Sequence, residues 1–378
     1  MTDKFARISA IDGYKREFIA GLNLVVIGAG AIGNEVVKNL VLFGVGKIRL
    51  YDFDKIEIHN LTRSVFFDES DVGLAKAEVV ASKANLLANK NTVTPVDSDF
   101  WAHLKIAELN HFDAVICAVD NFEARIKINQ LCSISKTPLF NTGIDHRYAS
   151  VDIFPFKENG ASSCYECNIP ASVYQKVAER YSCGWIRKIH SDQKTIPTTS
   201  ITASVVAAIC IGQLFEQLNP DLHQNYINYQ ASRRVLIDTK SLTISKTNLP
   251  VKASCPSGLH YENSPVFKIH GRTQITEILG KSIDQSEWSK VLVVFSEPIL
   301  LKTTKNGKTQ TVIFKCAESF DENILLDNGA RTLDAEIVEE MPVERLIMEF
   351  AEYAIPCNFI KIIHPKLETD LIVELSDE

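Results

Sequence analysis

Short apolar runs and amphipathic segments alternate along the first two thirds of the chain. Residues 24–28 form a continuous apolar run, as in a strand that is buried on both faces. Residues 34–43 follow with apolar side chains at helical spacing, and residues 47–51 have the composition of a second strand. This order of strand, helix and strand within about thirty residues predicts a βαβ unit.

The alternation continues as far as residue 156. We expect helices at 74–88 and 122–134 and strands at 113–119, 138–141 and 150–156. Strands that alternate with helices in this way form a mostly parallel sheet whose faces the helices cover. The sequence therefore predicts a doubly wound, Rossmann-like α/β fold.

Residues 157–200 interrupt this alternation with a turn rich in glycine, serine and cysteine and then a polar, basic stretch. We interpret them as an excursion that leaves the sheet and returns to it. A long helix is expected at 201–218, and its most apolar part is too short to cross a bilayer, so it should be a core helix. Short strands are expected near 226–230, 235–238 and 242–245.

A domain boundary is expected near residues 254–265, because the hydrophobic periodicity changes beyond them. We therefore predict a first domain at 1–260, which contains the excursion, and a small α+β domain at 266–378. The elements expected in the small domain are strands at 291–295, 311–315, 359–363 and 371–374 and a helix at 343–353.

Composition and charge narrow the classes of function. The 378 residues are 46% hydrophobic and 23% charged, which are ordinary values for a globular protein. A net charge of -7 argues against nucleic acid as a main partner, because binding phosphates needs a basic surface. The charged start lacks the apolar region of a signal peptide, and the nine cysteines then suggest a reducing compartment. We expect a cytoplasmic protein that binds neither nucleic acid nor membranes.

The first βαβ unit contains a candidate nucleotide site. Gly28, Gly30 and Gly33 form a G-x-G-x-x-G pattern between the predicted strand and helix, where glycines allow the backbone to approach phosphates closely. Asp52 lies 19 residues beyond Gly33, at the end of the second strand, where a carboxylate can bind ribose hydroxyls. These features alone indicate a dinucleotide such as NAD.

Three further charged residues favour a triphosphate instead. A dehydrogenase has no evident need for Arg63 and Lys76 after its ribose carboxylate, whereas charge builds up on triphosphate oxygens during group transfer. Asp120 closes the strand expected at 113–119, and a carboxylate facing phosphates there is a natural Mg²⁺ ligand. The alternatives are solvated surface charge for the two cations and a helix N-cap for Asp120.

Taken together, the motifs G-x-G-x-x-G, D-F-D, N-L-x-R, G-x-x-K and D-N-x-x-x-R resemble those of the ubiquitin-activating superfamily, which includes the ThiF and MoeB adenylyltransferases. The resemblance covers about residues 5–260 and implies an adenylation domain that uses ATP. It implies that Asp52 holds the ribose, that three residues contact the phosphates and that one binds Mg²⁺. These positions are Asn60, Arg63 and Lys76 for the phosphates and Asp120, beside Asn121, for Mg²⁺.

The same resemblance implies a homodimer with two sites. In that superfamily an arginine upstream of the first strand reaches into the partner subunit's site. Arg7 is the first candidate for this catalytic role, and Arg16 is the second.

Four residues form a candidate zinc site. Cys164 and Cys167 make a C-x-x-C loop, which is half of a structural zinc site. Cys255 and His260, near the domain boundary, supply a possible second half. The superfamily usually has a second C-x-x-C there, so this spacing departs from its pattern. We predict a Zn²⁺ site, with a redox pair and unliganded thiols as the alternatives.

Cys183 is the candidate nucleophile. Arg180, Arg187, Lys188 and His190 surround it in the sequence, and positive neighbours favour the reactive thiolate. Its position in the excursion resembles the crossover loop that carries the thioester cysteine of the superfamily.

The resemblance implies adenylation of the C-terminal glycine carboxylate of a ubiquitin-like protein. Transfer to Cys183 as a thioester and delivery to a ubiquitin-conjugating-like enzyme would follow. The alternatives are adenylation of a sulfur-carrier protein without conjugation, adenylation of a small molecule or tRNA, and an NAD-dependent oxidoreductase.

Overall fold

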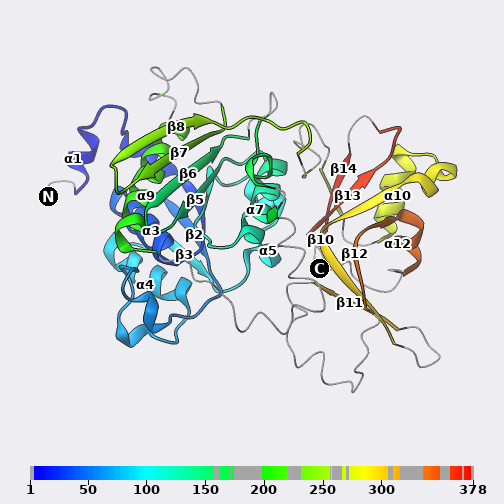
Figure 1. The fold of residues 1–378 in the computed structure, drawn as a ribbon, viewed down its shortest axis with the longest axis horizontal. Helices are drawn as coiled ribbons and strands as arrows, with labels where there is room; N and C mark the ends of the chain where they lie inside the picture. Colours follow the sequence, from blue (N-terminus) through cyan, green and yellow to red (C-terminus); the bar gives the residue numbers. More distant parts are fainter. Residues whose placement is uncertain are drawn as a thin grey trace. The chain divides into compact units, whose positions relative to one another are not determined.

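The computed structural model describes most of the chain, and most of its helices and strands are labelled in Figure 1. The described residues are 4–156, 162–170, 172–173, 198–219, 221, 231–255, 257, 266–269, 272–304, 310–315, 335–349, 358–367 and 370–375. Their contacts divide them into two compact units, the first within residues 1–173 and 194–262 and the second within 263–378. The domain ranges expected from the sequence stay a prediction.

The first unit is built on an eight-stranded sheet with the order β3-β2-β1-β4-β5-β6-β7-β8. The strands from β3 to β5 are parallel, and those from β5 to β8 pair antiparallel. The prediction of a doubly wound, mostly parallel sheet is confirmed. The bounds are β1 Asn23–Ile27, β2 Lys47–Tyr51, β3 Val93–Val96, β4 Ala114–Cys117, β5 Leu139–Ile144, β6 Tyr148–Phe154, β7 Arg233–Asp238 and β8 Thr243–Asn248.

Helices cover both faces of this sheet. On one face α3 (Ala31–Phe43) packs against α4 (Lys76–Ala88) and α9 (Ser200–Leu218), while α7 (Phe122–Ser135) lies on the other face with α5 and α6 (Figure 1). The remaining helices of this unit are α1 Ala6–Ser9, α2 Arg16–Gly21, α5 Phe100–His103 and α6 Ile106–Leu109. Short 3-10 turns are η1 Ile58–Asn60, η2 Glu69–Asp71 and η3 Tyr165–Asn168.

Hydrophobic burial explains why these segments form core elements. Every residue of β1 after Asn23 is buried, and Leu24 and Val26 pack with α3 and α9 into a single cluster. Among the described helices, α9 is long and apolar enough to cross a membrane, but half of its most apolar window is buried. Because α9 packs on α3, β5 and β6, it is the core helix that the sequence predicts.

The second unit is a small α+β assembly with its own hydrophobic core. Its sheet has the order β11-β10-β13-β14-β9, and β12 pairs with β10. The bounds are β9 Val266–Ile269, α10 Arg272–Ser282, η5 Gln285–Lys290, β10 Leu292–Thr304, β11 Gln310–Lys315, β12 Ala335–Pro342, α12 Val343–Glu349, β13 Phe359–Ile363 and β14 Leu371–Leu375.

Candidate functional site

The glycine loop joins the end of β1 to the start of α3. Gly28 has φ +98, and a Cβ at this position would lie 2.7 Å from the Ala118 carbonyl oxygen. A Cβ on Gly33 would lie 1.9 Å from the Gly28 carbonyl oxygen. By contrast, a Cβ on Gly30, the N-cap of α3, would meet no described atom within 4 Å. Packing therefore requires two of the glycines, and the third leaves open space at a helix N-terminus, where phosphate oxygens bind favourably.

Asp52 directly follows β2 and contacts the glycine loop. One carboxylate oxygen accepts from the Ala29 amide at 2.6 Å, and the other accepts from the Asp54 amide at 2.8 Å. Burial raises the pKa of Asp52, while the Ala29 amide and the positive charge of Lys76 oppose that rise. Since a carboxylate has about four lone-pair positions, two remain for hydroxyl donors such as those of a ribose.

Lys76 is the first residue of α4 and lies close to Asp52. Its ammonium group is 2.7 Å from an Asp54 carboxylate oxygen, and its side chain is only 12% exposed. The Lys76 amide donates to the Asp54 carbonyl at 2.9 Å, and an isolated β-bridge joins Lys55 to Ala75. These contacts bring the start of α4 to the end of β2.

Asn60 and Arg63 lie on the segment between β2 and α4. The Asn60 side-chain oxygen accepts from the Glu57 amide at 3.0 Å, which leaves the Asn60 Nδ2 group without a partner among the described residues. One guanidinium nitrogen of Arg63 donates to the His59 carbonyl at 3.0 Å. The remaining N–H groups of Asn60 and Arg63 are donors of the kind that phosphate oxygens accept.

Asp120 follows β4, so it lies at the same edge of the sheet as Asp52, where the parallel strands end. The side chain is exposed and makes no hydrogen bond or ion pair with any other described residue. The neighbouring Asn121 is the N-cap of α7, because its side-chain oxygen accepts from the Ala124 amide at 2.8 Å. The capping role considered for Asp120 therefore belongs to Asn121, and the Asp120 carboxylate stays available for a cation.

Arg125 is a residue whose role the sequence does not reveal. Its guanidinium donates to the Asn141 side-chain oxygen and to the Thr142 carbonyl, both at 2.5 Å, and also to the Val119 carbonyl. Val119 directly precedes Asp120. Arg125 thus ties the start of the Asp120 loop to β5.

The two arginines considered for the dimer lie elsewhere. Arg7 is exposed in α1, near Phe5, whose ring approaches Gly44 at the C-terminal end of α3. The glycine loop is at the opposite end of this 13-residue helix, which is about 20 Å long. Arg16 donates to the Gly44 carbonyl at 2.8 Å and stacks on Phe5, so its contacts are those of a helix cap. The structure therefore brings neither arginine to the site of its own chain.

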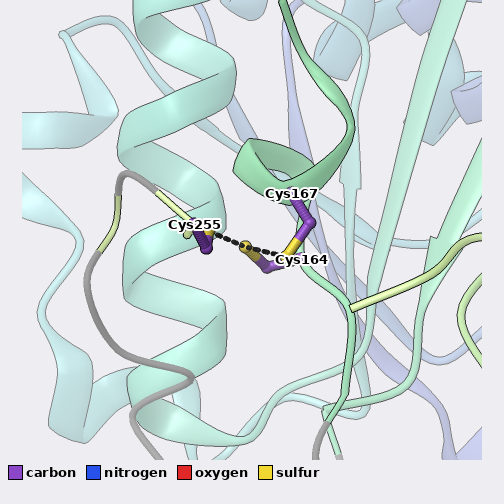
Figure 2. Close-up of side chains that lie close together, drawn as sticks. All are labelled: Cys164, Cys167 and Cys255. Carbon is purple, nitrogen blue, oxygen red and sulfur yellow. Dashed lines mark hydrogen bonds between the residues drawn. The ribbon is translucent and has the colours of Figure 1, made fainter. Parts of the chain in front are cut away.

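Cys164, Cys167 and Cys255 converge from segments far apart in the sequence (Figure 2). The Sγ atom of Cys164 lies 3.8 Å from that of Cys167 and 3.6 Å from that of Cys255. In a tetrahedral zinc site with Zn–S bonds of about 2.3 Å, sulfur atoms are about 3.8 Å apart. The hydrogen bond from Cys164 lowers the pKa of Cys255 and raises that of Cys164, as expected for thiols that share a proton. The three thiols thus fit Zn²⁺, while the predicted ligand His260 lies outside the described residues.

Helix α7 holds the C-x-x-C loop in place. The Asn129 side-chain oxygen accepts from the Tyr165 amide at 2.8 Å, and both Asn129 and Gln130 donate to the Glu166 carboxylate at 3.3 Å. Asn129 and Glu166 are buried. The helix that begins beside Asp120 therefore also supports the cysteine cluster.

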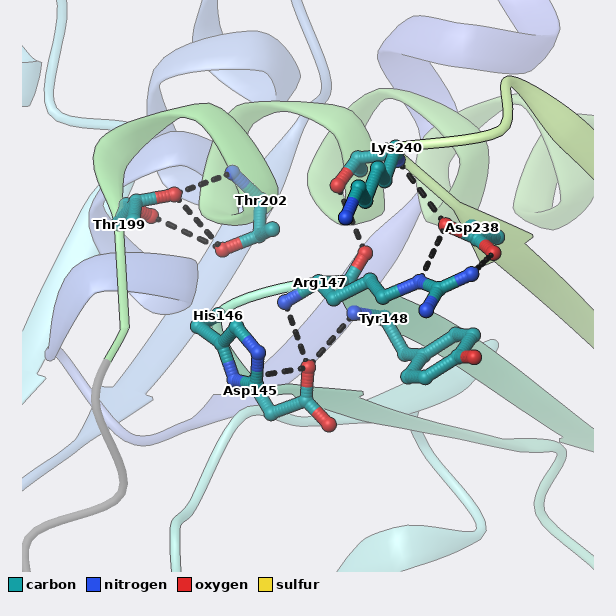
Figure 3. A network of polar contacts seen from close by, with 9 residues as sticks. Asp145, His146, Arg147, Tyr148, Thr199, Thr202, Asp238 and Lys240 are labelled. Carbon is teal, nitrogen blue, oxygen red and sulfur yellow. Dashed lines mark hydrogen bonds and ion pairs between the residues drawn. The ribbon is translucent and has the colours of Figure 1, made fainter.

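Polar contacts also fix the β5–β6 turn at the carboxyl edge of the sheet (Figure 3). Asp145 accepts from the amides of Arg147 and Tyr148 at 2.7 and 2.6 Å, and the Arg147 guanidinium pairs with both carboxylate oxygens of Asp238. Because that guanidinium donates to it, the pKa of Asp238 is held below its usual range. The Thr199 side chain caps the N-terminus of α9. The Arg147–Asp238 pair thus joins the β5–β6 turn to the end of β7. The candidate nucleophile Cys183 lies outside the described residues.

Comparisons with known proteins show which sequences and folds this chain resembles. The sequence pattern of the ThiF family matches residues 5–255. Ubiquitin-like modifier-activating enzyme 5 from Aedes aegypti is 29% identical over 238 residues, a match that covers 60% of this chain and 57% of that protein. The enzyme of the same name from Drosophila virilis is 27% identical over 362 residues, covering 91% and 86%. SUMO-activating enzyme subunit 2 from Dictyostelium discoideum is 28% identical over 223 residues, covering 58% and 32%.

Solved structures show the same fold. The crystal structure of E. coli MccB with ATP superposes with a TM-score of 0.53 at 22% identity, and the match covers 68% of this chain and 74% of that one. The microcin C7 biosynthetic enzyme MccB in complex with N-formylated MccA gives a TM-score of 0.51 at 23% identity, covering 65% and 69%.

Proposed function

The chain belongs to the ThiF family, and from that premise we propose that it uses ATP to adenylate the C-terminal glycine carboxylate of a ubiquitin-like protein. The observation that carries this proposal is the meeting of the glycine loop, Asp52, Lys76 and Asp120 at one edge of the sheet. This edge includes the point between β1 and β4 where the strand order reverses, and ligands of open α/β sheets bind at such points. The relatives named as ubiquitin-like modifier-activating enzymes support the class of substrate.

Each residue of this site has a separate role in adenylation. The N-terminus of α3 and the open space beside Gly30 receive phosphate, and Asp52 holds the ribose. A carboxylate oxygen of the modifier attacks the α-phosphorus as the bond from that phosphorus to the pyrophosphate oxygen breaks. The pyrophosphate leaves with the electron pair of that bond. Asn60, Arg63 and Lys76 donate hydrogen bonds to phosphate oxygens and offset the charge that builds up on them.

Two metal ions accompany this proposal. Asp120 would hold Mg²⁺, which offsets phosphate charge when it is bound. Cys164, Cys167 and Cys255 would hold Zn²⁺ with His260 as the fourth ligand, and the sulfur separations near 3.8 Å support that assignment. Such a site would join the C-x-x-C loop to the segment that contains Cys255.

The later steps depend on Cys183. In our proposal its thiolate attacks the acyl adenylate, a thioester forms, AMP leaves, and the modifier passes to a ubiquitin-conjugating-like enzyme. We expect wild-type protein with ATP and the modifier to form an adduct that thiols reverse, and Cys183→Ala protein to form none. Adenylation without any such adduct in the wild type would favour a sulfur-carrier adenylyltransferase instead.

Adenylation itself is tested by ATP–pyrophosphate exchange. We expect exchange when the chain is mixed with a ubiquitin-like protein that ends in glycine. The same protein with its terminal carboxylate amidated is the matched control and should support none. Exchange that depends on a small acid or on RNA, and not on such a protein, would contradict the proposal.

A further inference from the structure

One buried side chain links the two parts of the candidate site that contact phosphate. Asn34 follows Gly33 in α3 and is fully buried. Its Nδ2 group donates to the carbonyls of Ala29 and Gly30 at 2.6 and 3.1 Å. Its Oδ1 atom accepts from the Phe66 amide, 32 residues away, at 2.9 Å. A single amide group thus satisfies three backbone groups on two separate segments.

These two segments are the ones that must act together on ATP. Ala29 and Gly30 form the middle of the glycine loop, and Phe66 ends the stretch that carries Asn60 and Arg63. The backbone of Ala29 is held at both of its polar groups, because its N–H donates to Asp52 and its carbonyl accepts from Asn34. The loop that receives phosphate is therefore fixed to the ribose carboxylate on one side and to the Arg63 segment on the other.

We propose that Asn34 is a positioning residue that sets the glycine loop at a fixed distance from Arg63, and this rests on the proposed function. Only a side chain with two amide donors and one oxygen acceptor makes these three bonds. An aspartate in its place would direct carboxylate oxygens at the loop carbonyls. A displacement of about 1 Å at a reacting centre costs about a hundredfold in rate, so losing this link should affect ATP binding and turnover.

A purely structural role is the competing explanation, and the chain contains a matched control for it. Asn85 on α4 also makes three side-chain bonds to backbone groups, accepting from the Thr92 and Val93 amides at 2.8 Å and donating to the Val93 carbonyl at 2.9 Å. These bonds lie at the start of β3, where the parallel strands begin, whereas the candidate site lies where the parallel strands end. Losing Asn85 should lower stability without affecting ATP.

The test compares Asn34→Ala, Asn34→Asp and Asn85→Ala with wild type in thermal melts, ATP binding and ATP–pyrophosphate exchange. We expect both alanine variants to melt at lower temperature. Asn34→Ala should weaken ATP binding and reduce kcat/KM for ATP by about tenfold to a hundredfold, while Asn85→Ala stays within about twofold of wild type. Asn34→Asp should lose at least as much as Asn34→Ala, because it adds negative charge beside the phosphates.

Asn34→Ser provides a milder variant if Asn34→Ala does not fold, since its hydroxyl can still donate to the Gly30 carbonyl four residues back. It should bind ATP more weakly than wild type. Wild-type ATP affinity in the Asn34 variants that fold, or an equal loss in Asn85→Ala, would overturn the positioning role. If wild-type protein shows no ATP–pyrophosphate exchange, only the proposed function is overturned. The role of Asn34 is then still decided by comparing the ATP dissociation constants of the variants and of wild type.

Discussion

Gly30 and Gly33 belong to one motif but are needed for different physical reasons. A Cβ on Gly33 would overlap the Gly28 carbonyl oxygen, whereas a Cβ on Gly30 would meet no described atom within 4 Å. Gly33 is therefore required by the packing of the protein, whereas in our proposal Gly30 leaves the room that a bound phosphate needs.

Alanine substitutions should separate these two roles. We expect Gly33→Ala to lower the melting temperature by several degrees, because the loop must move away from the start of α3. Gly30→Ala should melt like wild type but bind ATP at least about tenfold more weakly, since its methyl group occupies the phosphate position. Thermal melts and ATP titrations check this pair. A Gly30→Ala protein with wild-type affinity would place the phosphates elsewhere.

Asp238 provides a prediction about pH. The Arg147 guanidinium holds the pKa of Asp238 below its usual range, so this pair stabilises the fold above the unfolded Asp pKa of about 3.9. That contribution is lost as the pH falls through the lowered pKa. We expect Asp238→Asn to melt below wild type near pH 6, with the gap closing as the pH falls below about 4. A gap of constant size down to pH 3 would contradict this role of the pair.

At the scale of elements, α7 supports both the cysteine cluster and the edge of the sheet that carries the candidate site. Its N-terminus adjoins Asp120, and its middle holds the C-x-x-C loop through Asn129 and Gln130. The helix itself is well anchored, since Arg125 links it to β5. Removing the cysteine cluster should therefore lower the stability of the first unit but leave the position of Asp120 nearly unchanged.

Metal analysis tests the cluster directly. We expect purified protein to contain about one zinc per chain, and Cys167→Ser to lose most of it and melt at lower temperature. Cys132→Ser, which alters a buried thiol outside the cluster, should keep its zinc. A wild-type protein free of zinc after purification without chelators would favour unliganded thiols.

The sequence predicts best those elements whose pattern is strong and local. Residues 47–51 and 359–363 were expected as strands and have those bounds in β2 and β13. The sequence did not indicate β3, because it is four residues long and contains Pro95, which suits only an edge strand. Nor did it indicate β12, whose Glu336, Glu339 and Glu340 hide the apolar alternation. Both strands depend on pairing with strands distant in the sequence, β3 with β2 and β12 with β10.

The candidate site shows the same division. Its glycines and Asp52 fit a spacing that indicates nucleotide binding, whereas the role of Lys76 comes from its charge and from the resemblance to the superfamily. Asn34 could not be assigned a role in this way, because it bonds to backbone carbonyls of the loop and to the Phe66 amide, 32 residues away. Arg125 is the last residue of the D-N-x-x-x-R motif, but the motif does not indicate its partners on β5. Such partners leave no pattern of residue types, so only the folded chain identifies these links.

At the scale of the whole molecule, the position of Arg7 is the informative feature. It lies near the end of α3 that is remote from the glycine loop, so a catalytic role requires a second chain. The segment between Asp52 and Lys76 also exposes large apolar side chains that a partner could cover, namely Phe53, Ile58, Val65, Val72 and Leu74. The homodimer stays a prediction, and these exposed side chains are the surface that it would cover.

Subunit mixing tests this arrangement. We expect Arg7→Ala and Lys76→Ala to be nearly inactive separately, because each homodimer has two damaged sites. If Arg7 acts in the partner subunit's site, mixed dimers contain one intact site. Random pairing should then restore about a quarter of wild-type exchange. If mixed dimers are shown to have formed and the ATP–pyrophosphate exchange activity does not recover, Arg7 acts within its own chain or not at all.

The most direct test of adenylation at this site is ATP–pyrophosphate exchange by wild-type and Asp120→Ala protein with a ubiquitin-like protein that ends in glycine. Asp120 is exposed and bonds to no other described residue, so the variant should melt like wild type. We expect exchange in the wild type and a loss of about a hundredfold or more in Asp120→Ala. Equal exchange by the two proteins would contradict the site, and exchange that does not need the glycine-ended protein would contradict the substrate.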